Sequence, residues 1–323
     1  MTATTQTGAG LDVGVRIAAG ALAVAATVRA FGPGGSPHFV AIQTAAPYVL
    51  APAFIVAAVG ALRGLRVVTA VALVVMALHV VWTSDDLAVG RPADVEGALG
   101  ELRIVTSNVL FANDEIEELG RELAATDADV IALQELTPAH WEALEGSGVF
   151  DGYSERIVDP RRRARGSAIL SRLPLRDGEV IDVGGWPMTS GVLTVGNERV
   201  RLVNVHTAAP TAARNIDRWR AQLDQLADVD RFDEDHVIYA GDFNATFQHE
   251  PLRGLLDAGM EDAFAAAGRG MGATWPSGER YPPLFRIDHV FTSDAIRVTG
   301  VGTGAGTGSD HRPVVADLAI VGP

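Results

Sequence analysis

The chain of 323 residues is long enough for one large core or for two folded units. It carries a formal net charge of −14, with 48% hydrophobic and only 6% aromatic residues, which indicates a segment solvated by lipid. Five arginines in residues 1–99 balance five acidic residues, so the negative excess lies in residues 100–323. Because an acidic domain gains nothing from displacing counterions, this distribution disfavours duplex DNA as a partner. The chain has no cysteine, which excludes disulfides and thiolate metal sites.

Three apolar stretches precede the acidic part. They run from Asp12 to Phe31, from Val40 to Leu62 and from Leu65 to Trp82. Each is close to the roughly 20 residues that cross a bilayer as a helix. A cleaved signal peptide would explain only the first stretch, and a buried helical domain of a soluble protein is the other alternative. We predict three transmembrane helices in residues 1–83, followed by a polar linker with Gly and Pro over residues 84–100.

The short loops predict how the helices are oriented. Arg63 and Arg66 lie in the turn between the second and third stretches, whereas the loop of residues 32–38 has no arginine. The positive-inside rule therefore places this turn and the N-terminus in the cytoplasm. Arg29, near the end of the first stretch, counts against this orientation. We expect a multi-pass plasma-membrane protein whose chain after Trp82 lies outside the cytoplasm.

From Leu102 onward, short β-branched and apolar runs alternate with helical or polar stretches. The runs that predict strands are 102–108, 129–135, 167–171, 192–195, 199–206, 236–242, 287–292 and 313–320. Helices are predicted at 114–125, 138–144 and 213–229. Several of the strands are apolar throughout, which is typical of sheets covered on both faces.

Polar residues lie where many of these strands begin or end. They are Asn108, Glu135, His206, Asp242 and Asn244 in GDFNA, Asp288, and Asp310 with His311 in SDHRP. Because α/β folds bind ligands at strand ends, we expect these residues to form one site. A Mg²⁺ site needs oxygen ligands and open coordination positions. A hydrolase also needs a proton acceptor near the attacking water and donors to the phosphoryl oxygens. Carboxylates, amides and imidazoles supply all three.

The ordered motifs N-V, Q-E, N-x-H-x-x-P, G-D-F-N-A, I-D-H-V and S-D-H-R-P resemble the endonuclease/exonuclease/phosphatase (DNase I-like) family over about residues 101–320. This resemblance implies an α/β fold for residues 101–323, a four-layer sandwich of two packed mixed β-sheets flanked by helices. With its apolar N-terminal stretches, the chain is similar to the membrane-anchored branch of the family associated with teicoplanin resistance.

The resemblance also implies a metal site. Glu135 corresponds to the main ligand, with Asn108 beside it and Asp310 near the metal, which is Mg²⁺ or Mn²⁺ in this interpretation. DNA-repair nucleases of the family carry an acidic residue two positions after the first Asn, where this chain has Leu110. That departure puts a second carboxylate beside Glu135 in doubt and favours a single metal ion.

The resemblance assigns the remaining site residues to the reaction itself. Asp242 would orient or deprotonate the attacking water, and Asn244 would hydrogen-bond a phosphate oxygen. Asp288 would hold the ring of His311 in the required tautomer, and His311 would contact the phosphoryl group or the leaving oxygen. His206 would contact the phosphate from the opposite wall.

Arg161–Arg163 and Arg165 form the only basic cluster in the acidic part of the sequence. The cluster is either a solvated loop or a contact for phosphate or lipid headgroups. We predict Arg165 as a phosphate contact, and Arg214 as another. Trp186 and Trp275 lie in Gly- and Pro-flanked loops, where they would line a pocket or a bilayer-facing rim, or simply pack.

Together these features predict a membrane-anchored, metal-dependent phosphoesterase. A short tether to the bilayer makes the local concentration of lipid-borne phosphate high, so we expect a phospholipid or polyprenyl (di)phosphate as substrate. An extracytoplasmic nuclease is the alternative, against which the net charge and Leu110 argue. A non-catalytic binding module would have lost at least one member of the catalytic set, and all are present. Nucleic acid is the less expected partner, and the sequence indicates no protein partner.

Overall fold

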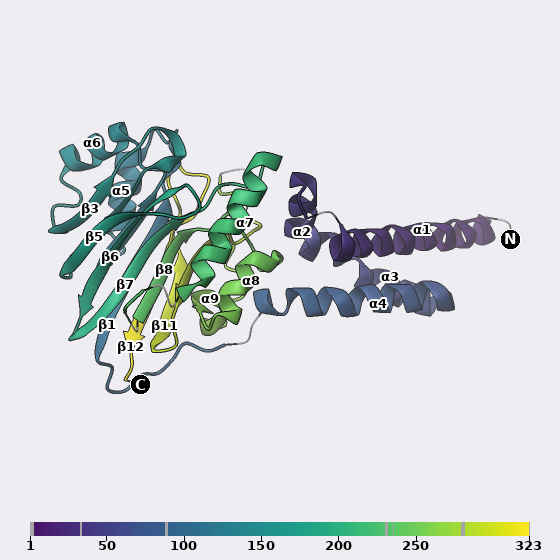
Figure 1. Ribbon diagram of the computed structural model, residues 1–323. Coiled ribbons are helices and arrows are strands. Elements are labelled where there is room, and N and C mark those ends of the chain that lie inside the picture. Colours follow the sequence, from purple (N-terminus) through teal and green to yellow (C-terminus); the bar gives the residue numbers. More distant parts are fainter. Residues whose placement is uncertain are drawn as a thin grey trace. The chain divides into compact units, whose positions relative to one another are not determined.

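The computed structural model describes residues 3–32, 34–87, 90–229, 232–234, 236–278 and 282–322. The chain divides into two compact units, Met1–Asp85 and Asp86–Pro323, which are described separately below (Figure 1).

The first unit is helical. Its helices are α1 (Ala3–Phe31), α2 (Pro37–Leu50), α3 (Ala53–Leu62) and α4 (Arg66–Thr83). The described residues contain three stretches long and apolar enough to cross a membrane, at 9–31, 37–62 and 66–83, which confirms the three predicted apolar helices. The second stretch is divided into α2 and α3 at Ala51–Pro52, because a proline nitrogen cannot donate the hydrogen bond that would continue the helix. Large apolar side chains such as Val24 and Ile55 are 64% and 68% exposed, as a lipid-facing surface requires.

The second unit contains two mixed β-sheets. Its strands are β1 (Gly100–Asn108), β2 (Val130–Gln134), β3 (Glu155–Asp159), β4 (Ser167–Ser171), β5 (Leu175–Asp182), β6 (Pro187–Val195), β7 (Glu198–His206), β8 (His236–Asp242), β9 (Glu261–Asp262), β10 (Asp288–Thr292), β11 (Ile296–Thr303) and β12 (Val314–Ile320). Within the described residues one sheet has the order β11-β12-β1-β2-β4-β3 and the other β5-β6-β7-β8-β10-β9.

Helices flank these sheets, as the prediction of a four-layer sandwich requires. They are α5 (Ile116–Ala124), α6 (Pro138–Ser147), α7 (Ala213–Ala227), α8 (Glu250–Asp257) and α9 (Ala263–Ala267), with short 3₁₀ turns at Asp85–Leu87 and Arg163–Arg165. Figure 1 shows α5 and α6 beside the sheet that contains β3, and α7 beside β8. The fold class predicted from the family resemblance is therefore confirmed.

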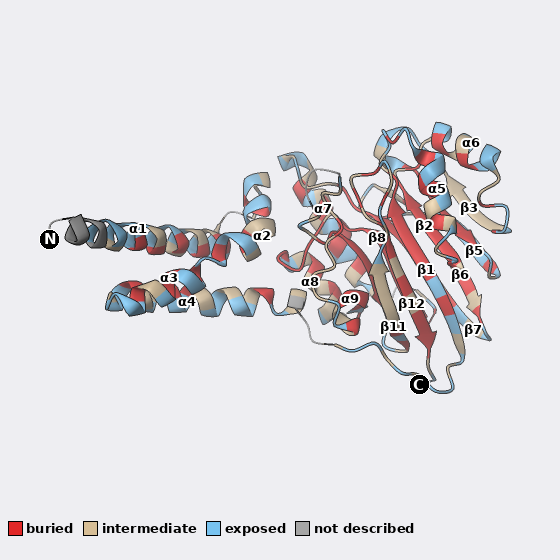
Figure 2. Cartoon of the chain, turned by 180° about the vertical axis from the view of Figure 1, so that it is seen from behind, coloured by how far each residue is buried: buried red, intermediate tan, exposed pale blue. Residues whose placement is uncertain are grey.

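The strand pleat explains how each sheet is covered on two faces. On β1, Ile104 packs into the core between the sheets, whereas its neighbour Val105 packs with Leu119 and Leu123 of α5. Alternate residues of one strand thus enter different cores, because successive side chains point to opposite faces. Figure 2 shows the central strands buried over most of their length, with exposed positions near the start of β1.

The parallel pairs in the middle of each sheet determine where the polar strand ends meet. β1 runs parallel to β2, and β7 runs parallel to β8. β10 is antiparallel to β8, and its first residue, Asp288, lies opposite the last residue of β8, Asp242. β12 is antiparallel to β1, so the loop that precedes it approaches the end of β1. The pairing therefore brings the ends that carry polar residues to one place.

The segment predicted as a linker follows the surface of the second unit. Ala93 N donates to Val298 O at 2.8 Å, and Leu99 N donates to Ile320 O at 2.9 Å. A Cβ on Gly90 would lie 2.0 Å from Ala266 O, so only glycine allows this close approach. At Gly90, Ala93 and Leu99 this segment is therefore held against the rest of the second unit.

Candidate active site

All eight residues predicted for the metal and for catalysis lie in one region of the second unit. The two pairs of parallel strands place them there. Asn108 ends β1, and Glu135 follows the neighbouring β2. His206 pairs with Asp242 across β7 and β8, and Asp288 faces Asp242 from the other side.

The backbone adopts unusual conformations at two of these positions. Glu135 and Asn244 have φ values of 60° and 48°, in the left-handed region that non-glycine residues seldom occupy. Such strained residues concentrate at functional sites, where the surrounding structure must hold them in place. Gly241, before Asp242, has φ of 152°, and a Cβ there would lie 1.9 Å from Val205 O. The glycine of the GDFN motif thus allows β7 and β8 to approach closely.

Asn108 joins the two carboxylates at the centre of the site. Its Nδ2 donates to Glu135 Oε1 at 3.1 Å and to Asp242 Oδ2 at 3.0 Å. The second oxygen of Glu135 accepts from the backbone N–H of Phe111 at 3.0 Å. The Asn108 oxygen accepts from Leu110 N at 3.0 Å, so the amide must turn over before this oxygen can ligate a metal. The ligand role predicted for Asn108 therefore stays a prediction.

His206 and Asn244 surround Asp242 from β7 and from the loop after β8. His206 Nε2 lies 3.7 Å from Glu135 Oε1 and 3.8 Å from Asp242 Oδ2. Asn244 donates from its backbone to Asp242 Oδ1 at 2.8 Å and from Nδ2 to Asp242 Oδ2 at 3.1 Å. Both side chains can therefore reach a group that is bound between Glu135 and Asp242.

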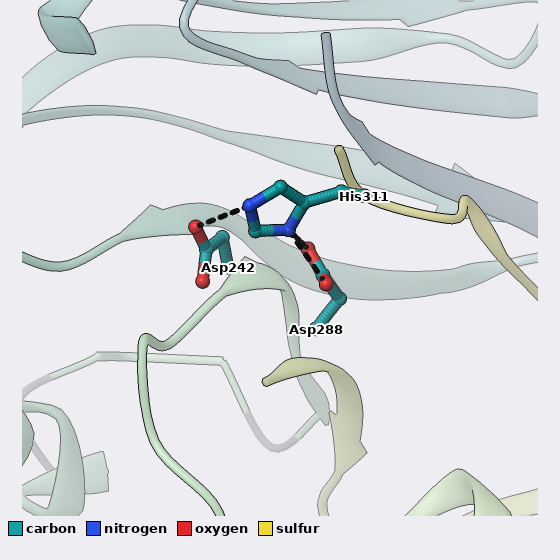
Figure 3. Close-up of side chains that lie close together, drawn as sticks. All are labelled: Asp242, Asp288 and His311. Carbon is teal, nitrogen blue, oxygen red and sulfur yellow. Dashed lines mark hydrogen bonds and ion pairs between the residues drawn. The ribbon is translucent and has the colours of Figure 1, made fainter. Parts of the chain in front are cut away.

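Asp288 holds the ring of His311 (Figure 3). The ring Nδ1 lies 2.9 Å and 3.1 Å from the two oxygens of Asp288, while Nε2 points toward Asp242 Oδ2 at 3.9 Å. A carboxylate bonded to Nδ1 selects the tautomer and orients the ring. Asp310 Oδ1 lies 3.9 Å from the same Nε2, and Asp310 Oδ2 accepts from Trp275 Nε1 at 3.1 Å.

Burial and neighbouring charges raise the pKa values of two residues of the site, Asp242 and His311. Burial is the main cause that raises the pKa of Asp242, with Asp288 adding to it and the charges of His311 and His206 opposing it. Burial alone would lower the pKa of His311, but the charges of Asp288 and Asp242 outweigh it and raise the pKa to about 10. Asp242 is therefore suited to accept a proton, and His311 is suited to carry a positive charge beside a phosphate.

The donor chemistry of the site fits a hard divalent cation. Asp242, Asp288 and His311 lie close enough to hold an ion. However, both Asp288 oxygens face the Nδ1 of His311, and Mg²⁺ prefers oxygen ligands with open positions. We therefore assign the His311–Asp288 pair to proton handling, and leave Glu135 and Asp310 as the candidate ligands. When bound, a cation there would polarise a phosphoryl oxygen and absorb negative charge.

The two arginines predicted as phosphate contacts lie differently. Arg165 Cζ lies 4.4 Å from the ring centroid of Trp186, and the Trp186 ring meets the His206 ring edge-on. Arg165 is thus linked to the site through two rings. Arg214 lies on the exposed face of α7, and no contact described in the structure joins it to the site.

Glu122 of α5 is a positioning residue that the sequence did not reveal. Its carboxylate accepts hydrogen bonds from the backbone N–H groups of Ala305 (2.7 Å), Gly306 (2.9 Å) and Thr307 (3.0 Å), and from Thr307 Oγ1 (2.9 Å). These bonds outweigh burial and lower the pKa of Glu122. Because this loop leads directly into Asp310 and His311, we expect Glu122 to help position both residues.

We expect Glu122→Ala to lower kcat by about 10- to 100-fold, since small displacements of catalytic groups have effects of that order. The substrate KM should change much less. Glu122→Gln keeps one acceptor oxygen and should retain more activity. Glu118→Ala is the matched control, because it removes the same charge from the exposed face of the same helix, where it forms an ion pair with Arg121. A kcat equal to that of the control would contradict the positioning role.

A buried Asp–His pair supports the GDFNA turn in a similar way. The structure buries His289 completely. Its Nδ1 lies 2.9 Å from Asp262 Oδ2, and its Nε2 lies 3.0 Å from Ala245 O. His289 therefore packs behind the site and fixes the backbone next to Asn244.

Comparison with known proteins agrees with this geometry. The sequence model of the Endonuclease/Exonuclease/phosphatase family matches residues 105–311, more than half of the chain. No curated protein matches the sequence.

Several solved structures share the fold. An endonuclease/exonuclease/phosphatase from Beutenbergia cavernae DSM 12333 is 20% identical, with a TM-score of 0.55 over 69% of this chain and 72% of that chain. TDP2 from D. rerio, complexed with a single-strand DNA product, is 18% identical, with a TM-score of 0.56 over 68% and 98%. A mannosyl-6-phosphatase from Bacteroides thetaiotaomicron VPI-5482 is 17% identical, with a TM-score of 0.54 over 67% and 99%. At these identities the likeness shows the fold alone.

Proposed function

The chain belongs to the endonuclease/exonuclease/phosphatase family and is a phosphoesterase, and we propose that it removes phosphate from a lipid at the outer face of the plasma membrane. The proposed substrate is a phospholipid or polyprenyl (di)phosphate. One observation carries this proposal: a complete catalytic set follows three apolar helices in the same chain. The resemblance to the teicoplanin-resistance branch, with its role near envelope lipid intermediates, remains part of the proposal.

The site residues have distinct roles in the proposed reaction. Asp242 accepts a proton from the attacking water, whose oxygen forms a bond to phosphorus while the bond to the leaving oxygen breaks in line. His311, held by Asp288, places a positive charge at the phosphoryl group. His206 and Asn244 contact phosphate oxygens. Glu135 and Asp310, with Asn108 once its amide turns over, would hold Mg²⁺ or Mn²⁺.

The charge distribution supports a lipid substrate over a nucleic acid. Residues 100–323 carry the whole excess of −14, and the phosphate backbone of DNA is bound chiefly through basic side chains. A tether to the bilayer instead raises the local concentration of any phosphate carried by a lipid. Binding of a lipid phosphate by a tethered domain therefore does not require a basic groove.

A phosphate-release screen of the detergent-solubilised full-length protein tests the function. Lipid phosphates, single- and double-stranded nucleic acids and sugar phosphates should be offered with Mg²⁺ or Mn²⁺. We expect the highest kcat/KM on a lipid phosphate or diphosphate. Nicking of plasmid DNA at a higher efficiency would favour an extracytoplasmic nuclease, and preference for a sugar phosphate would place the substrate among soluble metabolites.

The proposed topology rests on Arg63 and Arg66 at the turn between α3 and α4. Asp12, near the start of the first apolar stretch, pairs with Arg63 at 2.8 Å, which places both at the same end of the helices. A reporter that is active only outside the cytoplasm should be active after Pro323 and silent in the Arg63–Arg66 turn. The reverse pattern would place the site in the cytoplasm and shift the substrate to inner-leaflet lipids or soluble phosphates.

A further inference from the structure

We propose that Arg165 and Trp186 form a subsite for a second phosphate group of the substrate, so that the enzyme prefers a diphosphate to a monophosphate. This inference rests on the proposed phosphoesterase function and adds a specificity to it. The subsite lies beside His206, which ends β7. Asp288 begins β10, on the other side of β8, so the subsite and Asp288 lie on opposite sides of the site.

The segment that carries Arg165 is anchored next to the metal-ligand candidate Glu135. Leu136, the residue after Glu135, donates its N–H to Gly166 O at 3.0 Å and accepts from Arg161 N at 3.0 Å. A Cβ on Gly166 would lie 1.9 Å from Leu136 O, so the two segments are in direct backbone contact. The arginine segment is therefore part of the site wall and not a free surface loop.

Trp186 supplies a platform for the arginine. Val183 and Trp186 exchange two backbone hydrogen bonds, of 2.9 Å and 3.2 Å, across a tight turn whose central residues, Gly184 and Gly185, have positive φ. On one side, the Trp186 ring meets the His206 ring at a centroid distance of 6.1 Å and an angle of 88°. On its face it carries the guanidinium of Arg165, at 4.4 Å.

This arrangement leaves the guanidinium available for an anion. Stacking on an indole holds the plane of the arginine while its N–H groups remain free to donate in that plane. Arg161 is paired with Asp159 at 2.6 Å. For Arg165, by contrast, the ion pairs among described residues include no carboxylate partner, and the residue is exposed. An unpaired arginine in a strongly acidic domain creates a local positive region, which fits bidentate binding of a phosphate.

A second phosphate next to the scissile one would reach this region from the His206 side. In the proposed step, water adds to the terminal phosphorus and gives its proton to Asp242. The bond from that phosphorus to the bridging oxygen breaks, and the released monophosphate keeps the electron pair. Arg165 would hold this leaving phosphate and stabilise the charge that it gains. Orthophosphate and a monophosphate ester are the products, so no further reactant is needed.

A matched substrate pair tests the subsite. We expect Arg165→Ala to lower kcat/KM for farnesyl diphosphate by about 10- to 100-fold, the scale of a lost charge-assisted hydrogen bond, and to leave farnesyl monophosphate nearly unchanged. Trp186→Ala should behave like Arg165→Ala, whereas Trp186→Phe keeps a ring and should retain most of the preference. Arg176→Ala, on the exposed surface of β5, removes the same charge and should change neither substrate.

Two outcomes would overturn the subsite: equal losses on both substrates, or no loss on either. Calorimetric titration with inorganic diphosphate and with inorganic phosphate separates this inference from the proposed function. Even if no phosphoester is hydrolysed, tighter diphosphate binding that is lost in Arg165→Ala would support the subsite. Equal binding of both anions to the wild-type protein would refute it.

Discussion

His311→Ala and Asp242→Asn should each lower kcat by about 100-fold or more, the scale expected for losing a positioned acid–base group. The structure gives a physical reason for each loss. His311 provides a positive charge, and Asp288 orients its ring, with His311 Nδ1 2.9 Å from Asp288 Oδ2. Asp242 is the buried carboxylate of the site. The side chains that converge on it are those of Asn108, His206, His311 and Asn244. Phosphate release from the preferred substrate of the screen provides the measurement.

The design must separate lost chemistry from lost folding. His311→Ala leaves Asp288 buried without its partner, which is itself destabilising. The double variant His311→Ala/Asp288→Asn removes that unpaired charge. Because the two residues act as one unit, its loss in kcat should be smaller than the combined losses of the single variants His311→Ala and Asp288→Asn. Asp317→Asn, on β12 and paired with Arg103 at the surface, is the control for charge. Near-normal turnover of either single variant would show that the assigned role is wrong.

The sequence predicted the site residues because each sits at a strand end that apolar patterning marks. Strand β8 is buried throughout, so the run VIYAG and the GDFN that follows it could be recognised without knowing any neighbour. The pairing of the strands could not be predicted in this way. That Asp288 lies opposite Asp242 depends on the antiparallel register of β10, which no local pattern encodes.

Elements with weak patterns were missed for physical reasons. β5 is largely exposed, and its sequence LRDGEVID has no apolar alternation. The last three residues of β11 belong to the Gly-rich segment VGTGAGTGSD, and its pairing has a register shift between Val298 and Gly300. The helices α8 and α9 are short, and α5 begins at Ile116, two residues after the predicted start. Glu122 could not be identified either, because its partners are backbone groups of a loop far along the chain.

Removing divalent cations should abolish turnover, and the full-length protein should regain activity with Mg²⁺ or Mn²⁺. The candidate ligands are oxygen donors, and the site gathers several carboxylates around two imidazoles. A cation would compensate this excess of negative charge and absorb the charge that develops on phosphorus-bound oxygens. Undiminished turnover after exhaustive treatment with EDTA would contradict this expectation.

The variant Glu135→Gln tests whether Glu135 is a ligand of the metal ion. The amide preserves the shape, and its one oxygen can still accept from either Phe111 N or Asn108 Nδ2, but it lacks the charge that attracts the ion. We expect the Mg²⁺ concentration for half-maximal activity to rise by about 10-fold or more. A second readout does not need turnover: at a hundred times Kd, a bound ion stabilises the native state by about 2.7 kcal/mol. The rise in Tm with Mg²⁺ should therefore shrink in Glu135→Gln and persist in the exposed control Glu101→Gln. If both variants keep the wild-type Mg²⁺ dependence, Glu135 is not the ligand and Asp242 or Asp310 must provide the charge.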